Sequence, residues 1–241
     1  MSLPELSLQI IYARLAWALV AASMLLSVLP SMLPKLFPVL AQRTKLIVAV
    51  TVALVMALPG EASPAYWLTL VFQYPSGLLA GYSVVALFSR WTGKRVDFLL
   101  HPAFALFLTV LGVVLYLDAF GVIALGLYYR GFDAGASALL AGVAALAGVA
   151  AIWLRYGAGG AALLAGVLLF SLLRLPSGNL WDALLDPLLW AWAVGSLVAA
   201  GRRYYLQARA GSAVQPDAVP VKAPEPELEP ELARTRAGGM E

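Results

Sequence analysis

The sequence predicts an all-α, polytopic transmembrane helical bundle of about seven spans, with the N-terminus outside and the C-terminus inside. A short half-helix at the outer face and a disordered C-terminal tail complete the predicted fold. Two observations carry this prediction. Apolar residues make up 62% of the 241 positions and charged residues only 12%, against about 45–50% and about 25% in soluble domains. Basic side chains also gather in every second connector between the apolar stretches.

Seven apolar stretches supply the predicted spans, because a helix needs about 20 apolar residues to cross the hydrocarbon core of a membrane. Some stretches reach that length only together with their flanking residues. The predicted spans are residues 8–29, 46–58, 65–88, 98–117, 134–154, 158–175 and 188–200. We expect residues 1–206 to form the bundle and residues 207–241 to form the tail.

The first two stretches are predicted from their length and their flanks. Residues 8–29 contain Arg14 and are followed by no Ala-x-Ala cleavage site, which favours a retained helix over a signal peptide. Residues 46–58 form a stretch of only thirteen. They cross the membrane only if Arg43 and Lys45 extend their charged ends to one interface and Pro59 and Gly60 lie at the other.

The third stretch, residues 65–88, carries Pro75 near its centre. Proline removes one helix hydrogen bond and clashes with the preceding turn, so we predict a helix kink at Pro75. The alternative is a broken helix that lines a site. A carbonyl group freed in lipid then needs a new partner, which Ser76, Gln73 or a neighbouring helix would supply.

The fourth stretch, residues 98–117, has Pro102 in its first turn, where proline is tolerated. The segment that follows is apolar in its middle and charged at its ends, at Asp118, Arg130 and Asp133. Residues 120–129 are too short to span a bilayer. We therefore predict a half-helix or re-entrant segment that lies at one membrane face.

The fifth and sixth stretches are predicted to form a tightly packed helical hairpin. They carry pairs of small residues spaced four apart, which allow two helix backbones to approach closely in lipid. These pairs are Ala138/Gly142, Ala144/Gly148 and Ala162/Gly166.

The last span, residues 188–200, is preceded by a polar loop and is expected to begin a turn earlier, at Ala183. From about Gly211 the chain alternates proline with glutamate. Such a segment has no apolar face to offset the entropy of ordering, so we predict a disordered, cytoplasmic tail.

The connectors also predict the orientation, because loops rich in lysine and arginine remain in the cytoplasm. With the N-terminus outside, ten basic residues that flank the spans lie inside and three lie outside. The inner ten are Lys35, Arg43, Lys45, Arg90, Lys94, Arg95, Arg155, Arg202, Arg203 and Arg209, and the outer three are Arg14, Arg130 and Arg174.

Several kinds of chemistry are disfavoured by the residues present. The chain has no cysteine and a single histidine, His101, and no carboxylate lies within a predicted span. We therefore expect no metal site and no cofactor. A Ser137–His101 pair would have to bridge about 30 Å of hydrocarbon, which argues against serine proteolysis. The sequence leans against an enzyme, and no basic stripe with aromatic residues predicts a nucleic-acid partner.

The remaining polar residues gather at the predicted outer face. One interpretation is an ordinary polar interface, and the other is a shallow site at headgroup level that binds phosphate or carboxylate groups. The candidate ligand-binding residues are Asp118, Tyr128, Tyr129, Arg130, Asp133, Arg174, Asp182 and Asp186.

The two outer arginines are predicted to be paired with carboxylates. Asp118 and Asp133 lie near Arg130 in the sequence, and Asp182 and Asp186 follow Arg174. An unpaired charge held at the membrane boundary is costly, which favours such pairs. Binding of an anionic ligand by the arginines is the alternative.

Two functions are compatible with this sequence. The first is a non-catalytic accessory or assembly subunit of a bacterial envelope system, held in the inner membrane, with membrane lipids and another membrane or envelope protein as partners. The second is a small transporter or a protein that handles lipids or lipid-linked sugars, with a site at the outer membrane face, near Pro75 and the outer half-helix.

Overall fold

The computed structural model describes residues 4–32, 40–93 and 100–213. Over these residues the chain is helical, which agrees with the predicted all-α class. The helices are α1 (Leu6–Met32), α2 (Gln42–Met56), the short 3-10 helix η1 (Gly60–Ala62), α3 (Pro64–Phe72), α4 (Gly77–Trp91), α5 (Pro102–Ala119), α6 (Leu127–Arg130), α7 (Ala134–Trp153), α8 (Gly157–Leu173), α9 (Leu180–Leu184) and α10 (Pro187–Ala213).

The chain divides into two units, Met1–Ala200 and Gly201–Glu241. The described part of the second unit is helical through Ala213, and within it the Arg209 guanidinium lies 5.6 Å from the centre of the Tyr205 ring. Helix α10 thus extends beyond the end at residue 200 that the sequence predicted. The rest of the predicted tail, residues 214–241, lies outside the described residues.

Three helices of the described chain are long and apolar enough to cross a membrane: Leu6–Pro30, Pro102–Ala119 and Ala134–Trp153. Gly157–Leu173 is a shorter apolar helix. These four correspond to predicted spans.

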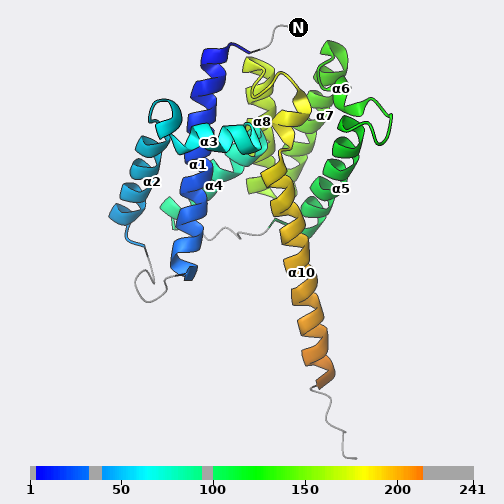
Figure 1. Cartoon of the computed structure of the whole chain (residues 1–241). Helices are drawn as coiled ribbons and strands as arrows, with labels where there is room; N and C mark the ends of the chain where they lie inside the picture. Colours follow the sequence, from blue (N-terminus) through cyan, green and yellow to red (C-terminus); the bar gives the residue numbers. More distant parts are fainter. Residues whose placement is uncertain (1–3, 33–39, 94–99, 214–241) are drawn as a thin grey trace, which may run out of the picture. The chain divides into compact units, whose positions relative to one another are not determined.

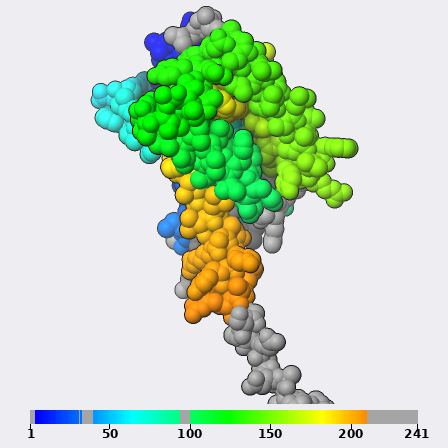
Figure 2. Space-filling model, turned by 90° about the vertical axis from the view of Figure 1, so that its right-hand side faces the viewer, coloured from blue at the N-terminus to red at the C-terminus, as the bar shows by residue number. Residues whose placement is uncertain are grey.

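Large apolar side chains also cover much of the surface, for example Leu139 and Leu146 on α7, which are 71% and 72% exposed. Figure 2 shows the face to which α7 belongs. So wide an exposed apolar surface is unusual for a protein in water.

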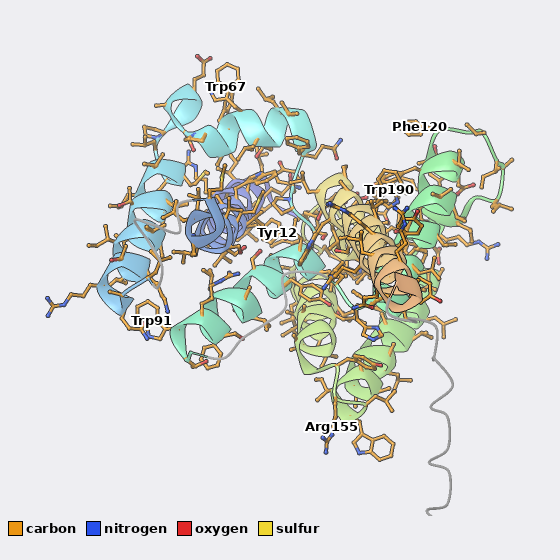
Figure 3. The ribbon with its side chains drawn as sticks, turned by 90° about the horizontal axis from the view of Figure 1, so that it is seen from below. Tyr12, Trp67, Trp91, Phe120, Arg155 and Trp190 are labelled. Carbon is orange, nitrogen blue, oxygen red and sulfur yellow. The ribbon has the colours of Figure 1, made fainter. Side chains whose placement is uncertain are left out.

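Helix α4 connects two groups of helices in the first unit. It packs against α1, which also contacts α2 and α3, and against α8, which pairs with α7. Figure 3 shows α1 enclosed by α2, α3 and α4 on one side of the molecule. Helix α3 lies across the direction of α1 instead of running along it (Figure 1).

The predicted kink at Pro75 is a complete break. Helix α3 ends at Phe72, Gln73 has a positive φ of 60°, and α4 begins at Gly77. Proline has no N–H group to continue the helix ladder, and Ser76 begins the new helix by accepting the N–H group of Leu79 at 3.1 Å. The broken helix of the alternative interpretation is therefore observed, whereas a site lined by the break stays a prediction.

The freed backbone groups of the break are bonded to distant side chains. The Tyr12 hydroxyl donates to the Pro75 carbonyl at 2.7 Å, and the Ser76 N–H group donates to the Asp186 carboxylate at 2.7 Å. Hydrogen bonds from other helices therefore stabilise the break, as a polar backbone in an apolar environment requires.

The predicted early start of the last span at Ala183 is wrong. Residues Leu180–Leu184 form the separate helix α9, and Leu185 is extended, with φ −144° and ψ 130°. Helix α10 begins at Pro187, because a proline disfavours helical geometry in the residue before it. Asp186 accepts the N–H groups of Leu188 and Leu189 at 2.9 Å each and thereby caps α10.

The predicted small-residue pairs have different outcomes: Ala138/Gly142 is exposed, the second pair contacts α8 at Gly148, and the third pair has a different partner. A Cβ atom on Gly166 would lie 2.9 Å from the backbone nitrogen of Leu78, and one on Gly81 would lie 2.9 Å from Cα of Ala162. Ala162 and Gly166 therefore bring α8 against α4, not against α7. Helix α7 meets α8 at Gly148, which faces the carbonyl of Gly160, whereas Gly142 faces open space.

Replacing Gly166 with alanine is expected to destabilise the protein by about 1–3 kcal/mol, because the new methyl group must displace backbone atoms of α4. The matched control is Gly142→Ala, where the methyl group meets nothing within 4 Å. This control should be neutral or stabilising by up to about 1 kcal/mol, since alanine favours helix over glycine. Thermal melting in detergent compares the two variants, and equal melting temperatures would contradict the tight α4–α8 contact.

Candidate functional site

Asp118, at the end of α5, organises the segment that the sequence predicted as a half-helix. Its side chain is buried, and its carboxylate accepts the N–H groups of Leu125, Gly126 and Tyr128, each at 2.8 Å. Gly126 has a positive φ of 66°, which interrupts any helix through this segment. The helix predicted over residues 120–129 is therefore wrong in extent: only Leu127–Arg130 are helical, as α6.

Helix α6 is joined to α9 by three further hydrogen bonds. Trp181 Nε1 donates to the Leu127 carbonyl at 2.8 Å, and Asn179 Nδ2 donates to the Tyr128 carbonyl at 3.2 Å. The Leu180 N–H group donates to the Gly131 carbonyl at 3.1 Å. A Cβ atom on Gly131 would overlap Asn179 Oδ1, so only glycine fits this contact. We call Asp118, residues 125–128, Gly131, Ser177 and residues 179–182 the α6–α9 network.

Asp182 and Tyr128 form the side-chain part of this network. The Tyr128 hydroxyl donates to Asp182 Oδ1 at 3.1 Å, and the Ser177 hydroxyl donates to Asp182 Oδ2. Burial raises the pKa of the Asp182 carboxyl. Burial and the nearby Asp182 raise the pKa of Tyr128 to about 12. The phenol therefore keeps its proton at neutral pH and acts as a donor.

Asp186 lies outside this network, although it is close in sequence. It is 5% exposed and accepts three N–H groups, from Ser76, Leu188 and Leu189. Its carboxylate thus holds the break before α4 and the first turn of α10 together. The structure gives this candidate site residue a role in positioning two helices.

The predicted ion pairs of Arg130 and Arg174 are not found within the described ranges. The Arg174 guanidinium lies over the Phe170 ring, 4.8 Å from its centre. Arg130 is exposed, and Asp133 instead caps α7 by accepting the N–H group of Ala136 at 2.7 Å. The physical reason is that these carboxylates already accept hydrogen bonds from nearby donors: Asp118, Asp133 and Asp186 from backbone N–H groups, and Asp182 from two hydroxyls. Pairing with a long arginine would instead cost side-chain entropy.

The eight candidate residues therefore separate into several places. Asp118, Tyr128 and Asp182 meet in the α6–α9 network, while Tyr129, Arg130 and Asp133 are exposed at the surface. Three members of the network, Ser177, Asn179 and Trp181, were not among the predicted residues. Asn179 caps α9 by accepting the Trp181 N–H group at 3.0 Å. Asparagine three residues after a proline, just before a short apolar run, is the signal that could have located this cap.

The geometry of the network is that of a structural connection. Its carboxylates accept bonds from fixed protein donors, and the described residues contain no group of three or more His, Asp or Glu side chains that could hold a metal ion. No protein-family model matches the chain, and no significant match is found among curated proteins or solved structures.

Replacing Asp118 with alanine is expected to lower the free energy of unfolding by at least about 2 kcal/mol. Three N–H groups lose their acceptor, each at a cost of about 1–3 kcal/mol, and hydrogen bonds to water recover part of this loss. Amide hydrogen exchange at Leu125, Gly126 and Tyr128 should accelerate in the same variant. The matched control is Asp133→Ala, which removes one exposed cap and should cost about 0.5–2 kcal/mol without affecting those three amides. Unchanged exchange in the Asp118 variant would refute its role.

Proposed function

We propose that this chain is an integral membrane protein that serves as a non-catalytic accessory or assembly subunit of a bacterial envelope system, held in the inner membrane. The observation that carries this proposal is the α6–α9 network. Its buried acceptors are bonded within the protein, so this face presents a fixed surface and not an open reaction site. A preorganised surface lowers the entropic cost of binding a partner.

We further propose that seven segments of the chain lie in the membrane: α1, α2, α4, α5, α7, α8 and the first part of α10. Helices α1 and α2 run in opposite directions in Figure 1, as do α5 and the first part of α10, which supports a serpentine path through the bilayer. Helices α2 and α4 have 15 residues each, or about 22 Å at 1.5 Å per residue. They need their basic ends to reach the interface. The basic connectors favour an external N-terminus.

The turn between α5 and α6 is the proposed partner surface. Phe120 and Val122 are 80% and 68% exposed, although Asp118 fixes the segment that carries them. Figure 3 shows Phe120 projecting away from the helices. Exposed apolar side chains on a fixed turn suit contact with another membrane or envelope protein. By comparison, an outer-face lipid or sugar site gains little support, since the acceptors of the network are already bonded.

Reporter fusions test the topology. Fusions at Gly93, Gly157 and Gly211 should all report the cytoplasm, whereas fusions at Pro64 and Ser177 should report the outside. A cytoplasmic signal at Ser177 would overturn the proposed orientation, because that position lies between two segments of opposite direction.

Co-purification tests the accessory role. The wild-type chain should retain a protein partner in a fixed stoichiometry after gentle solubilisation. The double variant Phe120→Ser/Val122→Ser should retain at least about tenfold less of that partner. The matched control is Leu58→Ser, which replaces an apolar side chain that is 41% exposed at a different turn. Recovery of the lone chain, or equal retention by both variants, would refute the proposed surface.

A further inference from the structure

A cavity of about 320 Å³ lies between α1, α4 and the first part of α10. Its volume falls at the lower end of the range for pockets that enclose small ligands, about 300–1,000 Å³. Its wall is mostly aliphatic and aromatic, and Met24 on α1, which is 55% exposed, forms part of the rim. The cavity is therefore apolar inside and accessible from the exposed side of α1.

Polar side chains line one part of this apolar wall. Ser23 and Ser27 on α1 and Ser83 on α4 face the cavity. The hydroxyls of Ser27 and Ser83 donate to backbone carbonyls of their own helices, and the Ser23 and Ser83 hydroxyl oxygens lie 3.3 Å apart. The spacing of the two α1 serines, one helical turn apart, places both on the face that turns toward α4.

Arg90 supplies the charge of the cavity. Its Nη1 group donates to the Ser23 carbonyl at 3.2 Å, so the guanidinium is held across the gap between α4 and α1. A guanidinium has five N–H donors, which leaves further donors for a ligand. Lys45 lies close by, because its Nζ group donates to the Arg90 carbonyl at 2.7 Å. Among the described residues that line the cavity, none is acidic.

We propose that this cavity binds one acyl chain of an anionic phospholipid, with the lipid phosphate at Arg90. The apolar wall matches the acyl chain, and the Arg90 guanidinium matches phosphate oxygens, which arginine recognises through paired hydrogen bonds. The net positive charge of Arg90 and Lys45 favours an anionic over a zwitterionic headgroup. The site does not depend on the proposed partner surface, from which it differs in every residue.

The test uses the purified full chain in detergent and measures lipid affinity by native mass spectrometry. Phosphatidylglycerol should bind about tenfold or more tightly than phosphatidylcholine. The variant Arg90→Gln should abolish that preference. Its affinity for phosphatidylglycerol should fall about ten- to a hundredfold, as expected for the loss of a charge-assisted contact. Arg90→Lys should retain part of it. The matched control is Arg155→Gln, which removes an exposed charge that does not line the cavity and should bind lipid like the wild type.

A second variant tests the acyl chain separately and covers the case in which Arg90→Gln fails to fold. Ala86→Phe fills the cavity while keeping Arg90, and should also lower phosphatidylglycerol affinity at least tenfold. Val84→Phe adds the same ring to a 48% exposed position of α4 that does not line the cavity, and should leave affinity unchanged.

Three results would overturn the proposal: equal affinity for the two lipids, unchanged affinity in Ala86→Phe, or inorganic phosphate that competes as well as the whole lipid. The last result would assign a free anion to Arg90 instead of a lipid headgroup.

Discussion

An interrupted helix backbone must be hydrogen-bonded somewhere, and this requirement determines much of the structure. The chain interrupts its helices at residues 73–76 and again at residues 120–126. The first interruption is bonded to Tyr12 and Asp186, and the second to Asp118. In lipid, where water is not available to such groups, each unmade bond costs several kcal/mol. The buried carboxylates are therefore best understood as acceptors for the backbone.

This same requirement separates what the sequence could predict from what it could not. Apolar runs that are long enough, or nearly long enough, to span a membrane correctly predicted the helices α1, α5, α7 and α8, because length and composition are local properties of the sequence. The outcome at Pro75 was not local, since the break is stabilised by Asp186, a residue 110 positions away from Ser76.

The partners of the small residues and of the arginines were also beyond the sequence. Ala162 and Gly166 carry the same pattern as the pairs in α7, so the pattern predicted a close contact but could not distinguish α4 from α7 as the neighbour. Proximity in sequence likewise suggested carboxylate partners for Arg130. It overlooked that the backbone N–H groups beside Asp118 and Asp133 compete for the same oxygens. The cavity beside Arg90 depends on three helices that are far apart in the sequence, and no single segment indicates it.

The bond between Ser76 and Asp186 has a consequence for biogenesis. A ribosome synthesises α3 and α4 long before Asp186, so the Ser76 N–H group at the break exists before its acceptor does. Until Asp186 is in place, this N–H group needs another acceptor, because an unmade hydrogen bond in an apolar environment is costly. The break between α3 and α4 is therefore completed only when the start of α10 has been synthesised.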